Sequence, residues 1–104
     1  MTDNDGSESI IGRIPPYEWD DQQAISFEVA QDTISLFIAY CTDRYWTERR
    51  KETPDQSVLD HWDEQSRAAV KDSQALRSDD PAAIRATLET YGQRVRELKG
   101  TAGG

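Results

Sequence analysis

The sequence predicts an all-α protein, an antiparallel three-helix bundle with a long first helix, a disordered acidic N-terminal tail and a short flexible C-terminus. Apolar residues recur at spacings of three and four, which is typical of helices, and no segment shows the alternation of strands. Proline-containing turn signals divide the chain near residues 53 and 80. Because such connections are short, consecutive helices are expected to be antiparallel neighbours.

The first helix is predicted over residues 20–51, starting at Asp20 or Asp21, whose carboxylates suit a helix N-terminus. Placing its residues at about 100° intervals gives two apolar stripes. The main stripe, expected to face the core, consists of Phe27, Ala30, Ile34, Phe37, Ile38, Cys41 and Tyr45. A second stripe on an adjacent side consists of Ile25, Val29, Leu36 and Tyr40, and Trp46 falls outside both.

The second helix is predicted over residues 54–77, with Thr53 as its cap, Pro54 at its first position and Gln56 completing a capping box. Two rows of residues repeat every seven positions along it and form a narrow seam of mainly small side chains. They are Trp62, Ala69 and Leu76, with Leu59, Ser66 and Ser73 beside them. Such a seam favours close approach to a bulkier neighbouring helix.

The third helix is predicted over residues 81–99, with Asp80 as its cap and Pro81 as its first residue. Gly100 is expected to end it as a left-handed cap. Its apolar residues follow a strict spacing of four and three, which is the cleanest pattern in the chain: Ile84, Leu88, Tyr91, Val95 and Leu98.

These elements divide the chain into a flexible N-terminal tail or arm (1–15), a three-helix domain (16–100) and a flexible tail (101–104). Within the arm, Ile10, Ile11 and Ile14 precede two prolines that favour an extended backbone. The arm is therefore expected either to fold back over a groove of the bundle or to dock on a partner.

The 104 residues carry a formal net charge of −8, which argues against binding to nucleic acid or to anionic membranes. No apolar run approaches the roughly 20 residues that span a bilayer. A single cysteine excludes an intrachain disulfide, and the acidic start lacks the basic and apolar regions of a secretory signal. A cytoplasmic location is therefore expected.

Candidate residues for chemistry are few. Cys41 and His61 each occur once, which raises the possibility of a thiolate–imidazole pair. Cys41, however, lies on the main apolar stripe, where a cysteine usually behaves as a small buried hydrophobe, and His61 is expected at the surface. No metal-ligand spacing and no glycine-rich phosphate loop is present. The sequence therefore predicts no enzyme, and it assigns no catalytic, cofactor-binding or metal-binding residue.

Several short segments support a family resemblance: Pro16-Tyr17-Glu18-Trp19-Asp20, Ile25-Ser26-Phe27-Glu28, Asp80-Pro81-Ala82-Ala83, and Tyr91 with Val95-Arg96. In these segments, over most of residues 15–98, the chain resembles small uncharacterised helical proteins of actinobacteria that are often found near plasmid-transfer and integrative-element genes. The resemblance implies a mobile-element or accessory setting. It implies no defined activity and no site residues.

The leading hypothesis is a non-enzymatic protein that binds a protein partner or itself, as a homodimer formed through the first helix. Its candidate interface consists of Ile25, Val29, Leu36, Tyr40 and Trp46. The alternative is an acidic nucleic-acid mimic that inhibits a DNA-binding protein. The concentration of acidic residues before position 40 prompts this second hypothesis.

Overall fold

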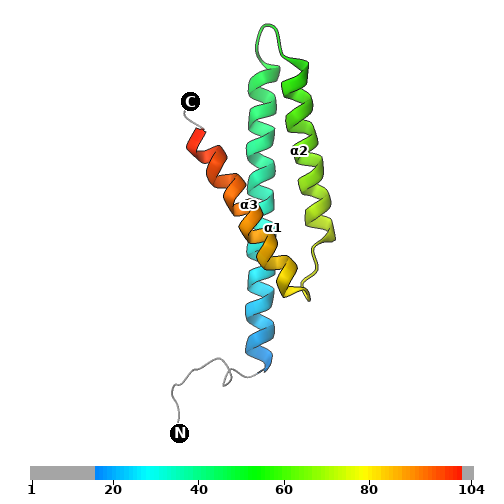
Figure 1. The fold of residues 1–104 in the computed structure, drawn as a ribbon, viewed down its shortest axis with the longest axis vertical. Coiled ribbons are helices and arrows are strands. Elements are labelled where there is room, and N and C mark those ends of the chain that lie inside the picture. Colours follow the sequence, from blue (N-terminus) through cyan, green and yellow to red (C-terminus); the bar gives the residue numbers. More distant parts are fainter. Residues whose placement is uncertain (1–15, 102–104) are drawn as a thin grey trace.

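The computed structural model describes residues 16–101, with side chains described from residue 25 to residue 100. This part of the chain forms three helices, α1 (Pro16–Arg49), α2 (Gln56–Ala75) and α3 (Pro81–Thr101). α2 runs back antiparallel to α1, and α3 crosses α1 obliquely (Figure 1). The predicted all-α, three-helix class is confirmed, and no strand occurs within residues 16–101.

α1 is the central element, because α2 and α3 both pack against it. No Cα atom of α2 lies within 8 Å of a Cα atom of α3. A polar side-chain contact nevertheless joins the two outer helices: the Tyr91 hydroxyl donates to the Asp72 carboxylate over 2.5 Å. The molecule is therefore built on one long helix with two partners rather than on three mutually packed helices.

All three helices contribute to the core, whose central cluster consists of Ile34, Phe37, Cys41, Ala69, Tyr91 and Val95. The rings of Phe37 and Tyr91 meet edge to face at a centroid distance of 5.4 Å. The Arg94 guanidinium lies 4.9 Å from the Tyr91 ring centroid, a cation–π geometry that covers the edge of the core. The main stripe of α1 therefore faces the core, as its spacing predicts.

α1 begins at Pro16, so the predicted start at Asp20 or Asp21 is wrong. Proline lacks an N–H, and the first residue of a helix has no intrahelical acceptor for that group. Pro16 therefore suits the first helical position, and the acidic residues that follow lie inside the helix. At the other end α1 stops at Arg49, two residues before the predicted boundary.

The cap of α2 is Asp55, and the predicted cap at Thr53 is wrong. The Asp55 backbone is extended, and its carboxylate accepts hydrogen bonds from the Ser57 N–H over 2.9 Å and from the Ser57 hydroxyl over 2.7 Å. These bonds lower the pKa of Asp55. An aspartate cap satisfies free amides of the first turn as well as a threonine does, and the chain uses the later of the two.

Glu48 stabilises the turn between α1 and α2 through two contacts of its carboxylate. Its side chain is buried, and Oε2 accepts the Asp55 N–H over 2.8 Å while Oε1 pairs with the Lys51 ammonium over 2.8 Å. The hydrogen bonds from Lys51 and from the Asp55 backbone lower the pKa of Glu48. A residue at the end of α1 thus holds the residue that caps α2.

We expect Glu48→Gln to lower the urea midpoint of unfolding at neutral pH, because the amide loses the ion pair with Lys51. Because the pKa of Glu48 is lower in the native protein than its ordinary value of 4.5, the ionised carboxylate stabilises the fold. This stabilisation is complete above pH 4.5 and is lost as the pH falls through the native pKa. The difference from wild type should therefore disappear in acid. Glu52→Gln in the same turn is the control, and an equal midpoint shift in both variants would contradict the role of Glu48.

The start of α3 follows the prediction, whereas its end does not. The Asp80 carboxylate accepts the Ala83 N–H over 3.0 Å, so Asp80 caps the helix and Pro81 is its first residue. The predicted left-handed cap at Gly100 is wrong, because the helix continues through Gly100 to Thr101. α2 ends at Ala75, before the predicted boundary at residue 77. The predicted arm over Ile10–Ile14 and the residues beyond Thr101 lie outside the described part of the chain.

Candidate interaction surface

The side of α1 that faces away from α2 and α3 carries three large aliphatic side chains. Ile25 is 60% exposed, Val29 46% and Leu36 47%. The spacings of four and seven place them along one line of the helix, and we call these three residues the outward stripe. Exposed aliphatic residues are common singly, but here three lie in one line on the longest helix, with Asp32 and Thr33 in the turn between Val29 and Leu36.

Contacts on the other sides of α1 explain why this stripe is left uncovered. Toward α2, the Gln31 amide donates to the Ser73 carbonyl over 2.9 Å. Toward α3, Phe37 meets Tyr91, and the Arg44 guanidinium donates to the Leu98 carbonyl over 2.9 Å. These contacts occupy two adjacent sides of the helix, so the remaining side has no neighbour within the described chain.

The first turns of α1 also extend beyond its partner helix. Gln31 is level with Ser73, which lies only two residues before the end of α2 at Ala75. Residues of α1 that precede about position 29 therefore pass the end of α2, and Figure 1 shows the N-terminal part of α1 running past the α2–α3 connection. Ile25 lies on this projecting part.

Tyr40 and Trp46 do not belong to the outward stripe. Tyr40 is half-buried and packs against the core cluster, so it is held by the fold. Trp46 is 49% exposed, but it lies roughly 80° around the helix from Leu36. Its ring meets that of Tyr45 edge to face, and both rings line a small groove of about 190 Å³ between α1 and α2. Only three of the five predicted interface residues thus form one surface.

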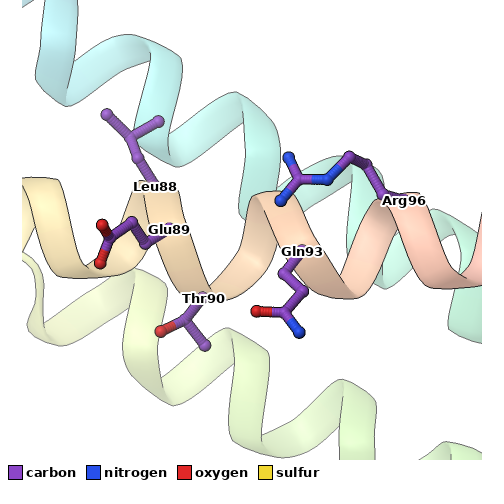
Figure 2. A pocket seen from close by; sticks show the side chains of 5 residues that line it. All are labelled: Leu88, Glu89, Thr90, Gln93 and Arg96. Atoms are coloured by element: carbon purple, nitrogen blue, oxygen red, sulfur yellow. The ribbon is translucent and has the colours of Figure 1, made fainter.

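A larger hollow, of about 580 Å³, lies on α3. Its lining residues are Leu88, Glu89, Thr90, Gln93 and Arg96. Figure 2 shows all five side chains projecting from this single helix, with Leu88 and Arg96 on one side of its axis and Thr90 and Gln93 on the other. Because one helix supplies the whole lining, the hollow is a shallow part of the surface and not an enclosed site.

A groove between the end of α2 and the start of α3, of about 330 Å³, has the Tyr91–Asp72 contact on its wall. Small and apolar residues, including Ala75, Leu76 and Ala83, line much of the rest. Burial raises the pKa of Tyr91 to about 12, and the hydrogen bond to Asp72 acts in the same direction. Tyr91 is therefore a protonated hydrogen-bond donor at neutral pH.

The Tyr91–Asp72 contact predicts a loss of stability in alkaline solution. The native pKa of about 12 exceeds the ordinary value of 10.0, so the stabilising contribution is complete below pH 10 and declines as the pH rises toward 12. We expect the free energy of unfolding to fall more steeply over this interval in wild type than in Tyr91→Phe. Urea titrations at several alkaline pH values would measure the difference, and parallel curves would contradict the prediction.

Cys41 and His61 do not form a catalytic pair. The Cys41 side chain is fully buried in the core, where burial raises the pKa of its thiol and a hydrogen bond with Ser66 opposes that rise. His61 is exposed and stacks edge to face on Trp62 at a centroid distance of 4.6 Å. The thiol is thus protonated at neutral pH and enclosed by the core, whereas the imidazole is exposed, so the two residues lack the features of an activated nucleophile.

Among the described residues, no group of three or more His, Cys, Asp and Glu side chains is arranged to hold a metal ion. No helix within residues 16–101 combines the length and the apolar character that a membrane span requires. Comparison of the chain with family models, with curated proteins and with solved structures found no match. The outward stripe is therefore characterised by its own geometry alone.

Sequence reasoning missed the polar contacts that hold the helices in place, among them those of Glu48 and Asp72. Glu48 reads in the sequence as one of several charges at a helix end, and Asp72 as a solvated residue on α2. A helical-wheel placement of Glu48 on the same side as Ala30 and Cys41 is the signal that could have indicated its burial. No comparable signal exists for Asp72, because its partner belongs to another helix.

Proposed function

We propose that this protein is a non-enzymatic interaction module that binds another protein through the outward stripe of α1. The observation that supports it most is the exposure of Ile25, Val29 and Leu36 on a helix whose other sides are engaged in the core. The stripe is the place where a further helix can be added without disturbing the existing packing.

The physical gain from such binding is modest but specific. Covering the exposed half of one aliphatic side chain contributes on the order of 1 kcal/mol. The three residues follow spacings of four and seven, which are among the spacings by which a helix presents anchors to a groove or to another helix. The stripe is much smaller than the roughly 800 Å² that each partner buries in a standard interface, which favours a reversible complex.

The test is affinity capture with three purified baits: wild type, Leu36→Gln and Val70→Gln. Val70 is 39% exposed on α2 and serves as the matched control, since it offers a similar aliphatic surface on another helix. We expect a partner, a second copy included, to be retained by wild type and Val70→Gln and lost with Leu36→Gln. Circular dichroism of the three baits should be identical. Capture of the same proteins by all three would contradict the proposal.

An acidic mimic of nucleic acid has less support. Of the 20 acidic and 12 basic residues, six acidic and one basic lie in residues 1–24, which leaves 14 and 11 in the remainder. In the described part acids also lie beside bases, as in the pairs Asp63–Arg67 at 2.9 Å and Arg77–Asp79 at 2.8 Å. A mimic requires a continuous row of carboxylates, and these pairs interrupt one.

The cellular setting completes the proposal. The resemblance to small actinobacterial helical proteins supports an accessory role in a mobile-element setting, and a cytoplasmic location is part of this proposal. In such a setting the module would act by occupying or joining another protein, with no chemistry of its own.

A further inference from the structure

We infer that the outward stripe of α1 takes a cationic amphipathic helix of a different protein, in preference to a second copy of this chain. The inference deepens the proposed function and rests on it. It follows from the charged residues that border the stripe. The apolar residues alone do not specify the charge of the partner.

The border of the stripe is acidic. Glu28, Asp32 and Asp43 are all exposed, and over residues 25–47 the sequence contains a single basic residue, Arg44. Arg44 turns toward α3, where it donates to the Leu98 carbonyl, and its nearest approach to Asp43 is a long 3.7 Å contact. The outward side of α1 therefore presents an aliphatic line with carboxylates along it.

The register of these carboxylates places them close to the aliphatic line. Asp32 lies three residues after Val29 and four before Leu36, and Asp43 lies seven residues after Leu36, so both share the side of the helix that carries the stripe. The distance from Ile25 to Leu36 along the axis is about 17 Å, which is three turns of a partner helix. A partner with aliphatic anchors over three turns and Lys or Arg at their flanks would complement both features.

A second copy fits this surface poorly. In a symmetric contact through α1, each stripe would bring the same carboxylates to the interface, and within residues 25–47 no Lys or Arg lies on the outward side to meet them. Arg50 continues the line of Leu36 and Asp43, but it lies beyond the end of α1 and about 21 Å along the axis from Leu36. Like charges at an interface disfavour association, whereas opposite charges steer binding and fix its register. The charge pattern thus selects a cationic partner.

The direct test uses three synthetic peptides and the full chain. The first peptide is an amphipathic helix of leucines flanked by lysines, the second has glutamates in place of the lysines, and the third has the composition of the first in scrambled order. Fluorescence anisotropy gives the affinities, and chemical-shift changes in two-dimensional NMR spectra locate the contact. We expect binding of the first peptide alone, with the largest shifts at Ile25, Val29 and Leu36 and weaker binding at high salt.

Matched variants separate the apolar contribution from the charge contribution. Leu36→Gln should weaken binding of the lysine peptide about tenfold, and Val70→Gln should leave it unchanged. Glu28→Gln combined with Asp32→Asn should weaken binding several-fold. Glu64→Gln combined with Glu89→Gln removes the same net charge from α2 and α3 and should have no effect. Equal loss in both double variants would show attraction to net charge alone and would overturn the inference.

Light scattering after size exclusion decides between this partner and a second copy. A monomer at all concentrations is expected. A dimer that Leu36→Gln dissociates would overturn the inference and leave the proposed function standing, because the stripe would still be an interface. A monomer that binds none of the peptides would also overturn it. The proposed function itself fails only if capture of partners does not depend on Leu36.

Discussion

Phe37→Ala is expected to destabilise the fold by about 3–5 kcal/mol, as deletion of a buried aromatic ring usually does. Phe37 is 3% exposed, packs edge to face on Tyr91, and lies beneath the Arg94 guanidinium at 5.8 Å from its ring centroid. Small domains have a total stability of roughly 5–15 kcal/mol, so this one substitution removes a large part of it. Urea denaturation followed by circular dichroism measures the loss.

The neighbouring residue supplies the control for Phe37. Leu36 lies one position earlier on the same helix but is 47% exposed, so Leu36→Ala should change the stability by about 0.5 kcal/mol or less. The two residues are adjacent on the same helix and differ in the direction of their side chains. Phe37 points into the core, whereas Leu36 points to the surface. Similar losses in both variants would contradict the burial of Phe37 and the exposure of Leu36.

Ala69→Leu is expected to destabilise the fold by about 1–3 kcal/mol through overpacking. Ala69 is fully buried in the cluster with Ile34 and Cys41, where α2 approaches α1. Three further carbon atoms can be placed there only by moving the two helices apart or by straining their side chains. Thermal unfolding followed by circular dichroism would show a lower Tm.

Ala68→Leu is the matched control for this crowding. Ala68 is exposed on the neighbouring position of α2, and a leucine there has nothing to displace. Both alanine and leucine are good helix formers, so the change of helix propensity is the same at the two sites. A Tm unchanged by Ala69→Leu would indicate that α1 and α2 are not in close contact at this residue.

The helical class and the side of each helix that faces the core could be predicted from the sequence, because both depend on residue spacing. The stripe that includes Ile34 and Phe37 is buried, and so are Tyr91 and Val95 on α3. Helix ends were harder to predict, because several residues at each turn can act as a cap. Asp55 rather than Thr53 caps α2, and Glu48, seven residues away, accepts the Asp55 N–H.

The candidate surface could be predicted only in part. Spacing alone identifies Ile25, Val29 and Leu36 as a line, but it assigns Tyr40 to the same line with equal weight. Among these residues, Tyr40 has the position on the helix closest to the side that faces α3, and its side chain packs against the core cluster. How much of a helix its neighbours cover depends on their crossing geometry, and no local pattern in a sequence specifies that.

The separation of α2 from α3 has a consequence for how the molecule opens. In a closed bundle each helix is retained by two neighbours, whereas here each outer helix is retained chiefly by α1. α3 can leave while the α1–α2 hairpin stays joined through the turn that Glu48 secures and through the Gln31–Ser73 contact. We therefore expect two cooperative units of unequal size, the α1–α2 hairpin and α3, and we expect the backbone amides of α3 to exchange with solvent before those of the hairpin.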